Sequence, residues 1–386
     1  MVKILFDSNL SGHHSEYIYY LVRFLEQERD NECDLFYLIV PDTIKVDFSY
    51  IVDLVESTPN IEFEFLSKET VQRLKSLPLP KRSFMELNLL IHYAAKLNAK
   101  HVYLLYFNIF QLSLVFKRLP FTISGILFLQ FHRMDVNSFK DFLKYVRKAL
   151  LTKLYSINSS VKSIFILNDI ETVEYLNYKF NTGKFRLLVD PIPNHTPEDN
   201  FDVYDYYKID RNLKILLHPG VINPRKGTYE IVKAVDHLPS GYSAVYAILI
   251  VGKAEDGFGD ELRSEIENIN NKDFKVIFDN SFVSNERLKA LFLQCSSVLI
   301  PYKNPEASSG ILGHAASAGK SVITSKAGLI GKIVETIGLG ITTSVTPTAI
   351  ANSITMLDTV VLDYQKISAF VEENNVDNFC KIILEN

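Results

Sequence analysis

Cysteine is scarce in this chain of 386 residues: only Cys33, Cys295 and Cys380 occur, and no two have Cys-x-x-Cys spacing. This scarcity argues against a disulfide framework and against a cysteine-bound zinc site, and it suits a reducing compartment. No run of about 18 apolar residues is present, so we expect no membrane-spanning helix. The first apolar run, residues 4–6, is too short for the core of a signal peptide, and we expect a cytoplasmic protein.

An excess of charge of either sign is also missing, because 41 Lys and Arg stand against 45 Asp and Glu, for a net charge of −4. We therefore expect no nucleic-acid partner. No Gly-x-Gly-x-x-Gly follows any apolar run, which disfavours a nicotinamide-dependent dehydrogenase. The chain has no Asp-x-Asp pair for a divalent ion, and His13 and His14 have no carboxylate or cysteine at ligand spacing. We expect a protein that needs no metal.

Apolar runs of strand length alternate with helical patterns over almost the whole chain, which predicts an α/β fold with parallel sheets. The strand-like runs are residues 4–6, 35–40, 61–65, 102–106, 126–131, 163–167, 214–217, 247–251, 276–278, 298–300 and 322–323. A segment rich in proline, residues 190–197, separates the first six from the last five and is the best candidate for a linker. The sequence predicts two Rossmann-like domains, residues 1–195 and 196–370, followed by a helix in residues 371–386.

The most informative stretch is residues 297–335. A buried strand over residues 298–300 ends at Pro301, and a helix is expected to begin near Ser309 and Gly310 and to end at Gly319. Another strand, residues 321–324, follows. Such a helix points its unpaired N–H groups and its positive dipole end at the carboxyl edge of the sheet, where a phosphate can bind.

The segment from Glu306 to Ile323 resembles the donor-binding motif of glycosyltransferase family 4, which contains retaining enzymes of the GT-B fold. Glu306 stands at the first glutamate position, and residues 315–323 match the Ala-x-x-x-Gly-Lys-x-Val-Ile tail. His314 occupies the position of the second glutamate. Residues 220–227 are similar to the family's Gly-Arg-x-x-x-x-Lys-Gly element, with Lys226 in register.

The resemblance implies a role for each matching residue. Glu306 and His132 would contact the donor sugar as the catalytic pair. The remaining assignments are Gly220, Arg225, Lys226, Ser309, Gly310 and Ile311 for the donor diphosphate; Lys253, Val283, Glu286 and His314 for the nucleotide; and Gly12 and His13 for the acceptor side.

The residues themselves leave plainer interpretations open. The adjacent cations Arg225 and Lys226 also suit a solvated turn, although Glu306 downstream favours phosphate binding. Glu286 also suits a capping box begun by Ser284 or Ser281. His314 is equally compatible with a ribose contact and with a histidine at a domain interface, and a lone histidine such as His132 is often structural.

Taken together, the resemblance implies transfer of a sugar from a nucleotide diphosphate sugar to a glycan or lipid-linked acceptor. The expected donor is a UDP-sugar. Transfer would proceed with retention of the anomeric configuration and without a cofactor. The last helix would cross back to the first domain. The rival interpretations are a non-catalytic, glycosyltransferase-like scaffold and a nucleotide-sugar epimerase on the same fold. The scaffold would have lost turnover with the second glutamate and with the family's first arginine, where Val221 stands.

One further stretch, residues 139–162, combines six cations with a single acidic residue, Asp141. Its apolar residues recur at helical spacing: Phe139, Phe142, Leu143, Val146 and Leu150. The favoured interpretation is a helix packed on the core with a solvated basic face. The alternative is peripheral contact with an anionic membrane, on its inner face.

Overall fold

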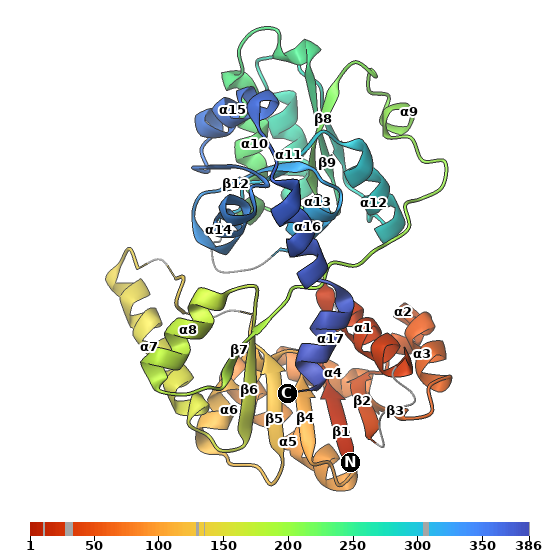
Figure 1. Ribbon diagram of the computed structural model, residues 1–386, viewed down its shortest axis with the longest axis vertical. Helices are drawn as coiled ribbons and strands as arrows, with labels where there is room; N and C mark the ends of the chain where they lie inside the picture. The colour runs from red at the N-terminus through yellow and green to blue at the C-terminus, as the bar shows by residue number, and fades with distance from the viewer. Residues whose placement is uncertain (11, 28–33, 129–130, 135, 304–308, 386) are drawn as a thin grey trace. The chain divides into compact units, whose positions relative to one another are not determined.

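The computed structural model describes residues 1–10, 12–27, 34–128, 131–134, 136–303 and 309–385. The chain forms two compact units, one made of Met1–Val189 with Val376–Asn386 and the other of Asp190–Asn375 (Figure 1). The first division therefore falls just after the last strand of the first sheet, before the prolines rather than at residue 195. The second falls where the last helix begins, at Val376 rather than at residue 371.

The first unit contains, within its described residues, a seven-stranded parallel sheet of order β3-β2-β1-β4-β5-β6-β7. The strands are β1 (Val2–Phe6), β2 (Leu35–Pro41), β3 (Ile61–Leu66), β4 (His101–Leu104), β5 (Thr122–Ile126), β6 (Val161–Leu167) and β7 (Phe185–Leu188). The helices are α1 (His13–Gln27), α2 (Ile44–Asp47), α3 (Ser49–Glu56), α4 (Lys68–Ser76), α5 (Leu79–Lys96), α6 (Gln111–Phe116), α7 (Phe139–Ser156), α8 (Ile170–Phe180) and α17 (Val376–Leu384).

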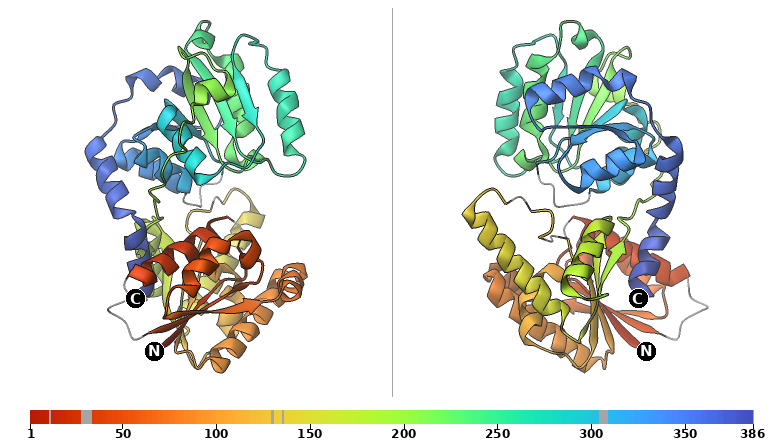
Figure 2. Two further views of the ribbon diagram at one scale, coloured as in Figure 1. Left: turned by 90° about the vertical axis from the view of Figure 1, so that its right-hand side faces the viewer. Right: turned by 60° about the vertical axis from the view of Figure 1, so that its left-hand side comes forward.

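Helices lie on both sides of this sheet (Figures 1 and 2). Successive residues of β1 accordingly enter different cores: Ile4 and Phe6 belong to one buried cluster and Leu5 to the other. Because both faces are covered, the strands are nearly continuous apolar runs, which is why the sequence pattern could predict a parallel sheet.

The strand expected over residues 126–131 is wrong, because β5 ends at Ile126. Leu127 still donates its backbone N–H to Phe165 at 2.8 Å, but the N–H of Phe128 turns to the side-chain oxygen of Asn108 at 3.0 Å. The chain thus leaves the sheet at this point. Its apolar character serves core packing instead, as the fully buried Phe131 shows.

The C-terminal helix α17 belongs to the first unit, as predicted. It packs against α1 and β7, and its Phe379 and Ile383 are buried in the same core as Tyr17. The hydroxyl of Tyr103 donates a hydrogen bond of 3.0 Å to the carbonyl of Leu384, which fixes the end of the helix to β4.

The second unit contains, as far as it is described, a six-stranded parallel sheet of order β10-β9-β8-β11-β12-β13. Its strands are β8 (Lys214–Pro219), β9 (Tyr246–Val251), β10 (Val276–Asp279), β11 (Ser297–Ile300), β12 (Ser321–Ser325) and β13 (Gly340–Thr343). Its α-helices are α9 (Val203–Tyr207), α10 (Thr228–Ala234), α11 (Phe258–Glu267), α12 (Asn285–Gln294), α13 (Gly310–Ser317), α14 (Gly328–Ile337), α15 (Pro347–Thr355) and α16 (Tyr364–Glu373).

Both sheets reverse their strand order once, between β1 and β4 in the first unit and between β8 and β11 in the second. At such a switch point the loops after the two central strands diverge to opposite faces and leave a crevice at the carboxyl edge, which is where ligands bind in open α/β sheets. The topology therefore singles out the loops that follow β1, β4, β8 and β11.

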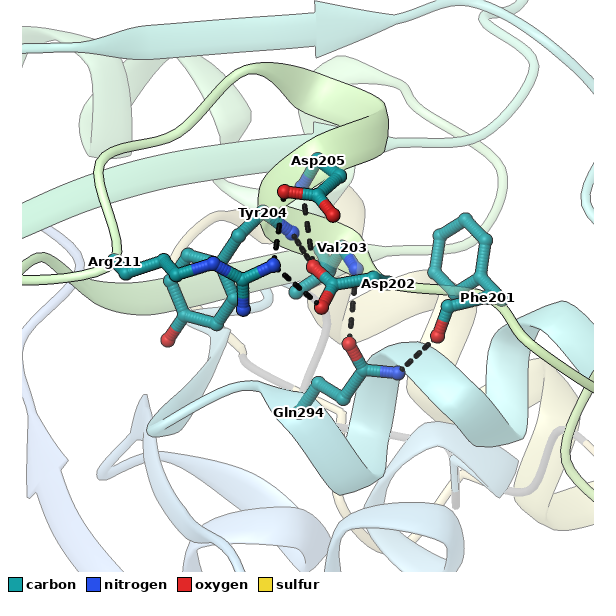
Figure 3. Close-up of polar contacts among 7 residues, drawn as sticks. All are labelled: Phe201, Asp202, Val203, Tyr204, Asp205, Arg211 and Gln294. Carbon is teal, nitrogen blue, oxygen red and sulfur yellow. Dashed lines mark hydrogen bonds and ion pairs between the residues drawn. The ribbon is translucent and has the colours of Figure 1, made fainter.

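A polar cluster attaches the start of the second unit to α12 (Figure 3). Asp202 caps α9 by accepting two backbone N–H groups of its first turn, and Arg211 forms an ion pair with it. The amide of Gln294 accepts the N–H of Val203 at 2.9 Å and donates to the carbonyl of Phe201 at 2.8 Å. One side chain thus satisfies two main-chain groups from a distant part of the chain.

We predict that Gln294→Leu lowers the free energy of unfolding by about 1–3 kcal/mol, because both main-chain groups lose their partner while the side-chain volume is kept. Urea unfolding measures this difference. Arg211→Ala is the control: its guanidinium is 61% exposed, so the ion pair with Asp202 contributes little and the midpoint should scarcely move. An equal loss in both variants would contradict the role given to Gln294.

Candidate functional site

The predicted donor residues gather at the switch point of the second sheet. Gly220 follows β8, Lys226 ends the short 3-10 turn Pro224–Lys226, and Ile311 lies in the first turn of α13, which follows β11. A Cβ atom added to Gly220 would lie 2.8 Å from the Nζ of Lys226 and 3.6 Å from the Cδ1 of Ile311. The structure thus brings together three residues that are far apart in the sequence.

Glycine is required here by close approach of the backbone. Gly252, directly after β9, has φ 141° and lies so close to β8 that a Cβ would stand 2.1 Å from the carbonyl oxygen of Gly220. Gly227 has φ 73°, and a Cβ there would meet the carbonyl oxygen of Pro301 at 2.2 Å. These two glycines let the loops after β8, β9 and β11 touch one another at the main-chain level.

Lys226 is the cation that this packing directs inward. Its side chain is half-buried, and its Nζ lies 5.1 Å from the ring centre of Tyr302. Among the residues that the structure describes, no carboxylate forms an ion pair with it. A half-buried ammonium without a counter-ion, close to the first turn of α13, is a suitable environment for an anion, since the helix start adds unpaired N–H groups and a positive dipole end.

Two other predicted cations have different surroundings. The side chain of Arg225 is 70% exposed and lies 3.9 Å from a carboxylate oxygen of Glu255. Lys253 is exposed as well, and its backbone carbonyl accepts the N–H of Ile222 at 3.0 Å. Within the described part of the chain, no ion pair or side-chain hydrogen bond directs either side chain toward Gly220, so their roles at the diphosphate and at the nucleotide stay predictions.

His218, which was given no role from the sequence, lies at the end of β8 and supports the loop that follows this strand. It is fully buried, and its Nδ1 donates to the carbonyl of Leu299 at 2.7 Å while its Nε2 lies 2.9 Å from the hydroxyl of Thr228. The imidazole therefore ties β8 to β11 and to the start of α10. Burial, aided by the nearby Lys226 ammonium, lowers the pKa of His218 to about 4, so the ring is neutral at pH 7. The sequence signal that could have indicated this role is a histidine at the end of an apolar strand, immediately before Pro-Gly.

His314, the residue in the second glutamate position, lies between two rings. It stacks on Phe292 with ring centres 5.4 Å apart and on His195 at 6.1 Å. Both neighbours belong to the same unit. The imidazole is therefore held by aromatic packing on the α13 face that looks toward α12.

Near the end of β10, Ser284 caps α12 by accepting the N–H of Arg287 at 3.2 Å. The carboxylate of Glu286 bonds to its own backbone N–H and to the Ser284 hydroxyl, and these bonds lower its pKa. Glu286 therefore takes part in capping, although one position earlier than in a capping box. The preceding Val283 is half-buried beside it. Contact of Glu286 or Val283 with a nucleotide stays a prediction.

Of the two residues predicted to be catalytic, Glu306 and His132, the structure describes only His132. Glu306 lies outside the described residues, as does Ser308. His132, in the first unit, stacks on Tyr175 with ring centres 4.1 Å apart. The next residue, Arg133, grips the carboxylate of Asp169 with two hydrogen bonds of 2.6 Å. Although burial opposes it, this fork and the hydrogen bonds from Thr172 hold the pKa of Asp169 below its usual range.

At the switch point of the first sheet, His14 faces inward and His13 is exposed. His13 is 60% exposed and lies 3.5 Å from Glu16. His14 is 14% exposed, and its Nδ1 lies 2.6 Å from a carboxylate oxygen of the buried Asp7. Gly12 has φ 67°, a conformation that favours glycine, and open space surrounds the position that a Cβ would take. Contact of Gly12 or His13 with an acceptor stays a prediction.

A buried carboxylate, Glu86 of α5, completes this polar group. It accepts a hydrogen bond of 2.8 Å from Ser8 and one of 2.6 Å from Arg82. Burial raises the pKa of Glu86, against the opposing effect of Arg82. Glu86 was not predicted from the sequence, because a glutamate in the middle of an amphipathic helix carries no signal of burial by itself.

Within the described residues, no three His, Cys, Asp or Glu side chains lie close enough to hold a metal ion. Over the same residues, no helix combines the length and the apolar character needed to cross a membrane.

Comparison with known proteins finds a family that is similar to the second unit. Residues 205–373 match the family described as glycosyl transferases group 1. The match covers most of the second unit. The family resemblance predicted from residues 220–227 and 306–323 is thereby confirmed. No curated protein sequence matches the chain.

Solved structures extend the likeness to the whole chain. A glycosyltransferase from Rickettsia africae ESF-5 superposes with a TM-score of 0.67 at 15% identity and covers 100% of this chain and 98% of its own. WaaG, a glycosyltransferase involved in lipopolysaccharide biosynthesis, gives 0.66 at 13% identity with 100% of both chains. The UDP-forming trehalose-phosphate synthase from Burkholderia xenovorans gives 0.66 at 12% identity, with 100% of this chain and 99% of its own. These likenesses establish the GT-B fold, as predicted.

We predict that Gly252→Ala destabilises the second unit by about 2 kcal/mol or more, since the new methyl group would meet the carbonyl of Gly220 in a backbone conformation that alanine rarely adopts. Urea unfolding measures the loss. Gly257→Ala is the matched control: Gly257 also has positive φ, but open space surrounds the position, so only about 1 kcal/mol is expected. Equal losses would show that the contact with Gly220 is unimportant.

The neutral, buried His218 predicts a pH dependence of stability. Its pKa is lowered when the protein is folded, so between about pH 6.5 and pH 4 the unfolded chain binds a proton that the folded chain does not. Stability is therefore complete above pH 6.5 and falls by about 3 kcal/mol as the pH drops to 4. Urea unfolding at pH 7 and pH 4.5 should show this slope, with less of it in His218→Asn and all of it in the control His237→Gln, an exposed histidine.

Proposed function

We propose that this protein is a retaining glycosyltransferase that moves a sugar from a nucleotide diphosphate sugar to a glycan or lipid-linked acceptor. The observation that carries the proposal is the half-buried Nζ of Lys226 beside Gly220 and Ile311, at the start of α13. A diphosphate is the part of such a donor that needs a cation and unpaired N–H groups together.

In this proposal the donor diphosphate binds Lys226 and the backbone N–H groups at Ser309, Gly310 and Ile311. As the bond to the sugar breaks, negative charge builds up on the leaving phosphate, and these groups are already oriented to stabilise it. The fixed positive charge fills the role that a divalent ion has in metal-dependent transferases, so we propose that no metal is needed. Arg225 would approach from the solvent side of the same loop.

The donor sugar would be held by Glu306 and His132, as the family resemblance implies. For the nucleotide we propose uridine diphosphate, which the UDP-forming synthase among the similar structures supports. For the acceptor we propose a glycan or a lipid-linked glycan, and the likeness to WaaG supports this class. Closure around both substrates would exclude water, so that transfer outpaces hydrolysis.

A second candidate function is a non-catalytic binding subunit on the same fold. The observation that favours it is the position of His314, which stacks between Phe292 and His195 where the family has a carboxylate. A subunit of this kind would bind a nucleotide sugar weakly or not at all and would not turn it over.

We predict that Lys226→Ala weakens the binding of the donor about tenfold or more, through loss of a charge-assisted hydrogen bond to the diphosphate. Calorimetry and thermal shift against UDP-, GDP-, ADP- and CMP-sugars, in the presence of a chelator, measure this change. Lys233→Ala is the control, because Lys233 lies on α10 of the same unit and pairs with Glu265 at its surface.

Donor hydrolysis and transfer to acceptors then test turnover with the sugar that binds. Binding that requires Lys226 and survives the chelator supports the proposal. If no nucleotide sugar shifts the melting temperature of the wild-type protein, the transferase proposal fails and the non-catalytic scaffold becomes the better account.

A further inference from the structure

Helix α7, Phe139–Ser156, is held to the first unit by a narrow face. Tyr155 is fully buried and packs on Phe107, and Thr152 is buried beside it. Nearer the start of the helix, Tyr145 packs edge-on against Phe131 and shares a hydrogen bond of 3.1 Å with Tyr175 of α8. This face is built of aromatic and small polar residues, and it fixes how α7 is rotated about its own axis.

The apolar residues of α7 do not belong to that face. All five are exposed: Phe139 by 76%, Phe142 by 48%, Leu143 by 53%, Val146 by 44% and Leu150 by 55%. At 100° per residue they fall within an arc of roughly 100° of the helix circumference. The interpretation favoured from the sequence, in which this stripe packs on the core, is therefore wrong.

A basic flank borders the exposed stripe. Lys140, Lys144 and Arg147 occupy the arc between the apolar stripe and the packed face, and all three are exposed. The only acidic residue of the helix, Asp141, lies on the packed side, where the side chain of Ser138 contacts it at 2.6 Å. Around the helix the order is thus packed face, apolar stripe and basic flank.

We propose that α7 is the surface by which this protein adsorbs to an anionic lipid bilayer. The stripe would enter the boundary between head groups and acyl chains, while Lys140, Lys144 and Arg147 lie at the level of the lipid phosphates. An apolar stripe bordered by cations and free of exposed carboxylates matches such a surface in both polarity and charge. Lys153, near the C-terminal end of the stripe, is long enough to extend its ammonium to the head groups.

The charge pattern separates this partner from a second copy of the chain. The protein as a whole has a net charge of −4, yet these cations are concentrated on one helix face. Two copies meeting through this face would bring the same cations together, which is unfavourable, whereas anionic lipid head groups neutralise them. This proposal does not depend on the enzymatic function, since adsorption can occur with or without turnover.

Vesicle flotation of the full chain tests the proposal. The probes are vesicles of phosphatidylcholine alone and vesicles that also contain about 30% phosphatidylglycerol, each at low and high salt. We expect flotation with the anionic vesicles only, weakened at high salt because the electrostatic part is screened. Replacing Leu143, Val146 and Leu150 by Gln should lower the partition coefficient about tenfold or more, and so should replacing Lys140, Lys144 and Arg147 by Glu.

Matched variants control for each change. Val46→Gln, Tyr178→Gln and Val361→Gln, combined in one chain, remove three apolar or aromatic side chains that are 85%, 90% and 89% exposed elsewhere. Replacing the exposed cations of α4, Lys68, Arg73 and Lys75, by Glu gives the same net charge as the α7 reversal. Both controls should float like the wild-type protein.

Four outcomes would overturn the proposal. They are failure of the wild-type protein to float with anionic vesicles, equal flotation with neutral vesicles, an equal loss in either control, and a dimer that the three Gln substitutions on α7 convert to a monomer. Light scattering without lipid decides the last of these, which would assign the face to a second copy. Donor binding measured on the same variants separates this test from that of the proposed function, since a failure of one leaves the other standing.

Discussion

The contact on which the candidate site depends is the close approach of three main-chain segments at the carboxyl edge of the second sheet. Gly252 lies against the carbonyl of Gly220, Gly227 lies against the carbonyl of Pro301, and the His218 imidazole joins β8 to β11. No side chain larger than hydrogen fits at either glycine. Beside these backbone contacts, the Nζ of Lys226 lies close to Gly220, which also approaches the side chain of Ile311 in the first turn of α13.

The two units share one sheet topology but place groups of different charge at its switch point. At the switch point of the second sheet the half-buried Lys226 has no ion-pair partner among the described residues, and the buried His218 nearby is neutral at pH 7. At the switch point of the first sheet the buried groups are the carboxylates of Asp7 and Glu86, each with a basic partner. A half-buried cation suits an anionic group, whereas the carboxylates of the first unit are buried and already paired, so they fix the loop after β1.

Much of this arrangement could be predicted from the sequence, because the strands after which the loops diverge are continuous apolar runs and the loops carry glycines and cations at characteristic spacing. The failures have a common physical cause. The burial of Glu86 and the end of β5 at Ile126 both depend on contacts between residues distant in the sequence. Periodicity describes one element at a time, so it cannot report which neighbour an element meets.

Helix α7 is the clearest example of that limit. Its sequence contains an apolar stripe that would suit a core, but Tyr155 is fully buried, Tyr145 is half-buried, and the hydroxyl of each has a hydrogen-bond partner. These two side chains therefore fix the rotation of the helix. Once they are packed, the stripe is turned outward. A chain under no constraint other than solubility would be expected to replace five exposed apolar residues by polar ones. Their presence next to Lys140, Lys144 and Arg147 is the physical reason for assigning them a partner with an apolar interior and an anionic surface.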